Sequence, residues 1–94
     1  MTYRIFNIIW LDDVVEKLAW KHNVVPMEVE EVLRTCKIYK HEVGHREGEY
    51  LYNGLGKTKA GRYLSVFFIL KEFKSAFVVT ARDMTSSERK RYRR

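Results

Sequence analysis

Cysteine is almost absent from this chain of 94 residues, which has Cys36 alone. A single thiol cannot close a disulfide within the chain, and it cannot supply the ligands of a cysteine-based zinc site. Cys36 falls on the apolar face of an expected helix, so we interpret it as a packing residue. His41 and His45 are spaced like paired ligands, but they flank a predicted turn and have no third partner at a fitting spacing. We therefore expect neither a metal nor another cofactor.

Long hydrophobic runs are also missing. The apolar stretch at residues 5–10 is short and is followed by Asp12 and Asp13. No segment approaches the ~18–20 apolar residues that cross a bilayer. We recognise no signal peptide, and there are no internal repeats, linkers or low-complexity tracts. The apolar fraction of 46% is enough for a real core. These features predict one cytoplasmic domain over residues 1–94.

Positive charge is what the chain has in excess. The formal net charge is +6, from 18 lysines and arginines against 12 acidic residues. Residues 82–94 hold six basic and two acidic residues, a net charge of +4. This asymmetry indicates a polyanionic partner, and nucleic acid fits better than a membrane because the segment has few apolar side chains. The alternative is that Lys90, Arg91, Arg93 and Arg94 only complement the helix dipole and keep the chain soluble.

Helical spacing of apolar residues occurs twice before residue 37. An amphipathic helix is predicted over about residues 12–22, with two aspartates in its first turn and Asn23 as a left-handed stop. Pro26 can open a second helix, because its missing N–H would be unpaired at that position anyway. Three valines, Leu33 and Cys36 recur on one face of this second helix, which should run to about residue 36.

A period of two begins at Lys37 and predicts β-strands joined by short turns, which favour antiparallel neighbours. The four strands are expected within residues 37–43, 49–55, 62–70 and 75–81. Residues 3–10 are aromatic and β-branched as well, and we interpret them as an extended segment with the option of an edge strand.

The last helix is predicted from Thr85-Ser86-Ser87-Glu88, which has the pattern of a capping box. The predicted fold class is therefore α+β. It has two N-terminal helices, a four-stranded antiparallel sheet and a short basic C-terminal helix, with the helices covering one face of the sheet.

Arg82 is the leading candidate for gripping phosphate. It ends the last predicted strand three residues before the helix begins, where its guanidinium and unpaired N–H groups could form an anion site. The alternative is a structural salt bridge with Asp83, Glu88 or an acid of the first helix.

Arg62 could make a second phosphate contact. It opens the third strand after a loop that carries Lys57 and Lys59, although these two lysines could simply be solvated. Lys21 and His22 end the first helix, where His22 could carry a proton near neutral pH or merely cap the helix. Tyrosines on the strands could stack unpaired bases, or they could be half-buried sheet residues.

The final residues, VVTARDMTSSERKRYRR, resemble the C-terminal signature of the BrnT family of toxins from bacterial toxin–antitoxin pairs. The matching positions are Ala81-Arg82, Thr85, Glu88-Arg89 and Tyr92. Upstream, the matching positions are Lys21, His22, Val24, Gly56, Gly61 and Arg62, with Asn23 in place of the usual glycine. The chain departs from the family pattern at Phe77 and at Tyr50 or Leu51, where the family often has arginine.

The resemblance implies a fold related to RelE-type toxins, metal-independent endoribonuclease activity and a cognate antitoxin encoded by an adjacent gene. The antitoxin would form a hetero-oligomer with the toxin. The candidate catalytic residues are Arg82, Arg62, His22 and Tyr92. The candidate RNA-binding residues are Lys21, Arg89, Lys57, Lys59 and Arg93.

Cleavage would proceed by attack of the RNA 2′-OH on its own neighbouring phosphate. Arg82 and Arg62 would stabilise the developing charge, and His22 or Tyr92 would carry the proton. The rival is a non-catalytic module that binds nucleic acid or docks a partner. Convergence of the two arginines with a histidine or tyrosine in one cleft favours the nuclease, whereas positions on different faces favour the binder.

For partner docking, the predicted surface is apolar. It consists of Phe67, Ile69 and Phe73, provided that these side chains are exposed.

Overall fold

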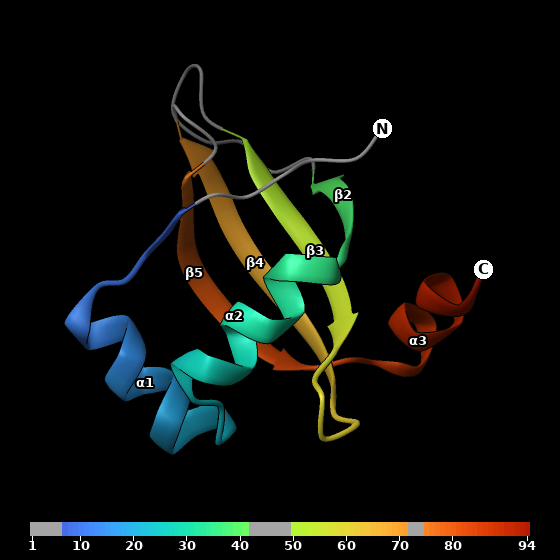
Figure 1. Cartoon of the computed structure of the whole chain (residues 1–94), viewed down its shortest axis with the longest axis horizontal. Coiled ribbons are helices and arrows are strands. Elements are labelled where there is room, and N and C mark those ends of the chain that lie inside the picture. Colours follow the sequence, from blue (N-terminus) through green and yellow to red (C-terminus); the bar gives the residue numbers. More distant parts are fainter. Residues whose placement is uncertain (1–6, 42–49, 72–74) are drawn as a thin grey trace.

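A computed structural model describes residues 7–41, 50–71 and 75–94 of the chain, and within them it contains three helices and five strands (Figure 1). Their bounds are β1 (Asn7–Ile9), α1 (Asp12–His22), α2 (Pro26–Thr35), β2 (Lys37–His41), β3 (Leu51–Lys57), β4 (Tyr63–Lys71), β5 (Ser75–Asp83) and α3 (Ser86–Arg93). The predicted α+β class is confirmed. No helix of these residues is long and apolar enough to cross a membrane.

The sheet has five strands rather than the four that were predicted, in the order β1-β5-β4-β3-β2. The four predicted strands form the antiparallel part. The additional strand, β1, lies at the edge and pairs in parallel with β5, with Asn7 opposite Ser75. Parallel pairing needs a long connection, and here most of the chain separates the two strands. The extended segment predicted near the start of the sequence therefore supplies this edge.

The helix signals read from the sequence hold in the structure. α1 ends at Asn23, whose φ of 54° lies in the left-handed region, and the N–H of the next residue, Val24, donates to the carbonyl of Leu18 at 3.0 Å. Pro26 occupies the first position of α2, which stops at Thr35, one residue before the predicted end.

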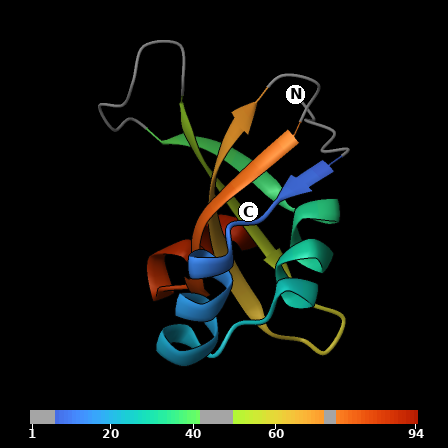
Figure 2. The same ribbon diagram turned by 90° about the vertical axis from the view of Figure 1, so that its left-hand side faces the viewer.

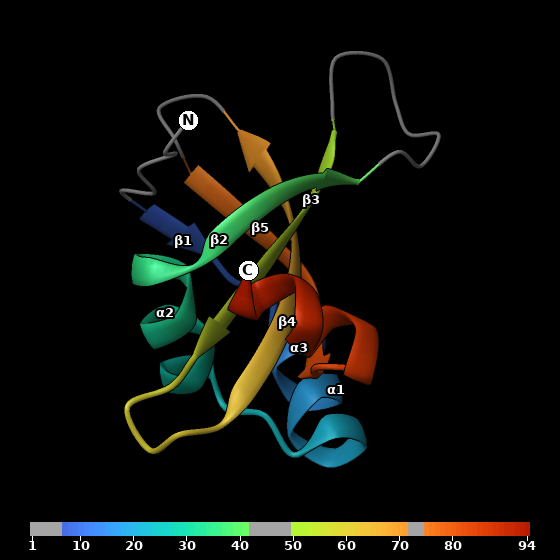
Figure 3. The ribbon, with the colours of Figure 1, turned by 90° about the vertical axis from the view of Figure 1, so that its right-hand side faces the viewer.

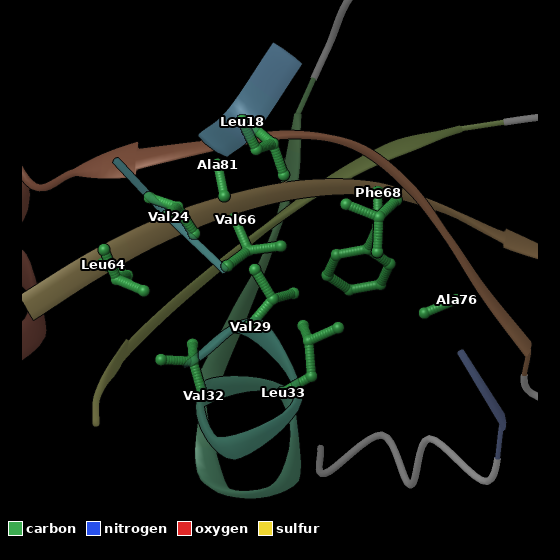
Figure 4. Close-up of a cluster of buried hydrophobic side chains, with 11 residues drawn as sticks. Leu18, Val24, Val29, Val32, Leu33, Leu64, Val66, Phe68, Ala76 and Ala81 are labelled. Atoms are coloured by element: carbon green, nitrogen blue, oxygen red, sulfur yellow. The ribbon is translucent and has the colours of Figure 1, made fainter. Parts of the chain in front are cut away.

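The main core lies between α1, α2 and one face of the sheet (Figure 4). The helices contribute Leu18, Val29, Val32 and Leu33, Val24 comes from the loop between them, and the sheet contributes Leu64, Val66, Phe68, Ala76, Val78 and Ala81. Two glycines let α2 approach the sheet closely. A Cβ on Gly56 would lie 2.9 Å from Cγ1 of Val32, and one on Gly54 would lie 3.0 Å from Sγ of Cys36.

A β-bulge in β5 decides which way its last residues face. Phe67 pairs with Thr80 and Phe68 with Val78, so β5 carries one extra residue at this point. Without it, Arg82 would share a face with Val78 and point into the main core. With it, Ala81 is buried in the core, and Arg82 points to the opposite face of the sheet.

α3 covers that opposite face, so the prediction that all helices cover one face is wrong for α3 (Figures 2 and 3). Because Gly54 and Gly56 face α2, Leu55 between them faces the other way, and it is fully buried there. α3 packs on β3 at this point. None of its residues, all of which are described, is fully buried, so its own apolar pattern contains no signal for the face that it takes.

Candidate nucleic-acid interface

The first turn of α3 is fixed by the predicted capping box. The Glu88 N–H donates to Oγ1 of Thr85 at 3.2 Å, and the Thr85 N–H donates to Oε1 of Glu88 at 2.9 Å. These two bonds satisfy groups that a helix start otherwise leaves unpaired. The prediction of a capping box is confirmed.

The other end of α3 is tied to strand β2. The Lys37 ammonium donates to the main-chain oxygens of Tyr92 and Arg94, both at 2.7 Å, and the Tyr39 hydroxyl donates to the carbonyl of Arg91 at 3.5 Å. A helix of eight residues is too short to persist alone. α3 therefore depends on polar contacts at its two ends.

Tyrosines and cations alternate between α3 and the sheet. The Arg89 guanidinium lies 4.4 Å from the ring centroid of Tyr63, and the Lys57 ammonium lies 5.7 Å from the same centroid. Tyr92 meets Tyr63 edge-on at 6.0 Å. Lys37 lies 5.4 Å from the Tyr92 ring. Each cation is held near a ring by its quadrupole while keeping its charge available to an anion.

The same arrangement continues at β2, where the Arg91 guanidinium lies 4.4 Å from the Tyr39 ring. We use the name α3 face for the surface formed by α3, Arg94, Lys37, Tyr39, Lys57 and Tyr63. A pocket of about 450 Å³ on this face is lined by Ser87, Glu88, Lys90, Arg91 and Arg94, and we refer to it as the α3 pocket.

Arg82 forms an ion pair with Glu88 beneath α3. Its Nη1 and Nη2 atoms donate to the two carboxylate oxygens of Glu88, at 2.7 and 3.1 Å. The guanidinium also lies 5.3 Å from the Phe67 ring. The Ser65 hydroxyl donates to Glu88 at 3.1 Å and accepts from the buried Asn53 at 2.7 Å. The structure thus contains the salt bridge that was the alternative for Arg82.

The Glu88 carboxyl is held in its charged form. Burial acts to raise its pKa, but the hydrogen bonds from Arg82, Thr85 and Ser65, together with the charge of Arg82, lower that pKa below its ordinary value. The negative charge of Glu88 is therefore present at neutral pH and is balanced by Arg82.

Arg62 is occupied by four partners on the other side of the sheet. Its guanidinium donates to Asp83 at 2.8 and 3.3 Å, to Glu28 at 3.2 and 3.3 Å, to the Asn23 carbonyl at 2.6 Å and to the His22 carbonyl at 3.0 Å. The bond to Asp83 is the main cause of a raised pKa for Arg62 and of a lowered pKa for Asp83. Arg62 thereby joins the end of α1 and the start of α2 to the end of β5.

The four predicted catalytic residues do not share one cleft. Arg62 and His22 lie on the side of α1 and α2, and Arg82 and Tyr92 lie beneath and within α3. Their catalytic role stays a prediction. By the criterion set from the sequence, positions on different faces favour the non-catalytic alternative.

The predicted RNA-binding residues divide in the same way. Lys57 and Arg89 converge on Tyr63, and Arg93 is exposed on α3. Lys59 is exposed in the turn between β3 and β4, where its backbone N–H donates to Glu31. Lys21 is exposed on α1, away from the α3 face. Three of the five therefore belong to the α3 face.

Sequence reasoning missed Lys37, which anchors α3, and it considered Tyr39 only as one of the strand tyrosines that could stack unpaired bases. The signal was available, because residues 37 and 39 alternate along one strand and must share a face. What the sequence did not contain was the side of the sheet on which α3 would lie.

In the described part of the chain, Cys36 does not belong to a group of metal-binding side chains. Within residues 7–41, 50–71 and 75–94 no three His, Cys, Asp or Glu side chains are grouped to hold a metal ion, and His45 lies outside those residues. Burial raises the pKa of the Cys36 thiol to about 12, against a smaller lowering effect of a backbone hydrogen bond, so the thiol stays protonated.

The predicted apolar docking surface is described only in part, and it stays a prediction. Phe67 and Ile69 are half-buried, and Phe73 lies outside the described residues.

Comparison with known proteins gives no assignment of family. No protein-family model matches the chain, and no curated protein is significantly similar to it. The candidate site therefore depends on the geometry of these residues alone, and the resemblance to BrnT toxins stays a prediction.

Proposed function

We propose that this protein binds RNA through the α3 face. The observation that carries the proposal is a group of cations that lie over tyrosine rings. Lys37, Lys57, Arg89 and Arg91 lie over the rings of Tyr39, Tyr63 and Tyr92, and Lys90, Arg93 and Arg94 are exposed on the same helix and at its end. Cations bind the phosphate backbone, and aromatic rings and guanidinium planes stack with unpaired bases.

The opposite side of the molecule supports this orientation. Residues 12–35, which include α1 and α2, contain six acidic residues and three basic ones, a net charge of −3. An RNA strand is therefore attracted by the α3 face and repelled by the helical side. Glu88, the acidic residue of α3, does not cancel the attraction because Arg82 is paired with it.

The proposal is tested by measuring the affinity for a short single-stranded RNA over a range of salt concentrations. With about four phosphate contacts, the slope of log K against log salt is expected to be near −3. The triple variant Arg89→Ala, Lys90→Ala and Arg93→Ala should reduce this slope by about 2. The double variant Lys17→Ala and Arg34→Ala, on the helical side, is the control and should leave the slope near the wild-type value. An equal reduction of the slope in both variants would contradict the assignment of RNA binding to the α3 face.

Cleavage of the bound RNA is the second candidate, and the observation in its favour is that Arg82 and Tyr92 both belong to the α3 side. As the resemblance to BrnT toxins implies, the 2′-OH would attack its neighbouring phosphate and the P–O5′ bond would break, leaving a 2′,3′-cyclic phosphate and a 5′-hydroxyl. Arg82 would stabilise the charge that develops, and Tyr92 would carry the proton from the 2′-OH to the leaving oxygen. We infer that Arg62 instead has a structural role, because its donors are already used. Arg82→Ala should abolish cleavage, whereas RNA binding by the α3 face should weaken without being lost, because Glu88 then has no cation paired with it. Cleavage that persists in this variant contradicts the assignment.

A cognate antitoxin belongs to the same second candidate. Expression of the chain alone should then arrest growth, and co-expression of the protein encoded by an adjacent gene should relieve the arrest by forming a hetero-oligomer. Growth that is unaffected by the chain alone leaves RNA binding as the function and rejects the toxin role.

A further inference from the structure

The α3 pocket brings several cations of the α3 face to one place. Among the described residues its lining includes Lys90, Arg91 and Arg94, and the one carboxylate in that lining, Glu88, is already paired with Arg82. A phosphodiester within an RNA strand brings one negative charge. A terminal phosphate monoester carries about −1.5 to −2 at neutral pH, which matches three converging cations better.

The size of the pocket is also suited to a defined ligand. Its volume of about 450 Å³ lies within the range of ~300–1,000 Å³ that is typical of small-molecule sites. This is enough for one nucleotide. A surface that only followed a continuous backbone would need a groove and no separate hollow of this size.

One of the pocket cations, Arg91, and the end of α3 are held in place before a ligand arrives. Arg91 lies against the Tyr39 ring, and Lys37 binds the main-chain oxygens of Tyr92 and Arg94 at the end of α3. These oxygens carry the negative end of the helix dipole, which would repel an anion. The Lys37 ammonium offsets that repulsion beside the pocket.

We propose that the α3 pocket binds a phosphate monoester on a nucleotide, either at the end of an RNA strand or on a free mononucleotide. This inference depends on the proposed RNA binding, because it adds a specific subsite to the same face. The Lys90, Arg91 and Arg94 side chains pair with the phosphate oxygens. The Arg91 guanidinium can present two donors to two of these oxygens.

The test compares three forms of one ten-nucleotide RNA with an internal fluorophore: a 5′-phosphate, a 3′-phosphate, or hydroxyls at both ends. The wild-type protein should bind one phosphorylated form at least about fivefold more tightly than the hydroxyl form. In the variant Lys90→Ala, Arg94→Ala that difference should disappear. The variant Lys17→Ala, Arg34→Ala should keep it.

A separate arm uses adenosine monophosphate to identify the source of the phosphate. If adenosine monophosphate binds the protein directly and displaces the phosphorylated RNA at the matching concentration, the pocket is assigned to free nucleotides. A strong preference for phosphorylated RNA without such competition assigns it to RNA ends. Equal affinity for all three RNAs, with no competition, overturns the subsite but leaves RNA binding by the α3 face intact. Absence of binding to every RNA instead rejects the proposed function.

Discussion

Arg82 and Glu88 form a two-point ion pair that joins the end of β5 to the first turn of α3, with N–O distances of 2.7 and 3.1 Å. The pair has two consequences. It fastens a short helix to the face of the sheet on which Leu55 is buried, and it balances an acidic residue in a basic surface. The arginine predicted to grip phosphate thus contributes first to the position of the helix that carries the other cations.

The variant Glu88→Gln separates the attachment of α3 from the balance of charge. Glutamine can still complete the capping box, so α3 should remain in place, while the charge at the α3 pocket becomes more positive. RNA affinity should rise about two- to fivefold, and the free energy of unfolding should fall by about 1 kcal/mol. Both are measurable by RNA titration and urea denaturation. Glu88→Ala is the comparison and should lose more stability, because it also removes the cap. A fall in RNA affinity of the folded Glu88→Gln protein contradicts this account.

Protonation of Asp83 and Glu88 should determine how the folding stability falls at low pH, because both carboxyls have lowered pKa values in the folded protein. A lowered folded pKa stabilises the fold above the unfolded pKa, for which the ordinary values are 3.8 and 4.5. That stability is lost as the pH falls through the folded values. The urea midpoint should therefore be level above pH 5 and fall below about pH 4.

The Asp83→Asn variant checks the origin of this acid loss. In this variant the urea midpoint should fall at low pH only slightly less than in the wild type. The reason is that 67% of the Asp83 side chain is exposed, so water screens the ion pair between Asp83 and Arg62. Glu88→Gln should reduce the fall of the urea midpoint at low pH more than Asp83→Asn does, since the Glu88 side chain is only 15% exposed. The reverse order of the two variants contradicts the assignment.

Arg62→Ala tests the structural role of Arg62. Loss of its bonds to the end of α1 and to Glu28 and Asp83 should lower the free energy of unfolding by about 2 kcal/mol. RNA affinity, measured below the unfolding transition, should stay at the wild-type value. A large loss of RNA binding or of cleavage by a folded Arg62→Ala protein returns this residue to the functional site.

Gly56→Ala tests the close packing of α2 on the sheet. The added methyl would lie 2.9 Å from Val32, so the variant should lose about 1–3 kcal/mol of unfolding free energy. In a Val32→Ala background the same change should cost less, because the clash is gone, and a double-mutant cycle measures this difference. Additive effects of the two substitutions contradict the predicted clash.

Local signals in the sequence predicted the helices well because each depends on a few neighbouring residues. Asn23 stops α1 in the left-handed region, Pro26 opens α2, and Thr85 caps α3, all as expected. The four antiparallel strands also follow from a period of two and short turns. These features need no knowledge of how distant segments meet.

The features that the sequence did not reveal depend on distant contacts or on one inserted residue. The bulge in β5 turns Arg82 toward α3 and Asp83 toward Arg62, and no residue type marks it. β1 and β5, which pair in the sheet, are the first and the last strands in the sequence. The face chosen by α3 is set by polar contacts such as that of Lys37, which carry no periodicity. The candidate site could thus be predicted by residue type but not by arrangement.

Backbone amide chemical shifts during titration with a short single-stranded RNA test the central claim most directly. The account predicts that the largest changes fall on α3, on Lys37 and Tyr39 of β2, and around Lys57 and Tyr63. Residues of α1 and α2 should change little. Changes concentrated on α1 and α2, with α3 unaffected, would contradict the assignment of the α3 face as the RNA-binding surface.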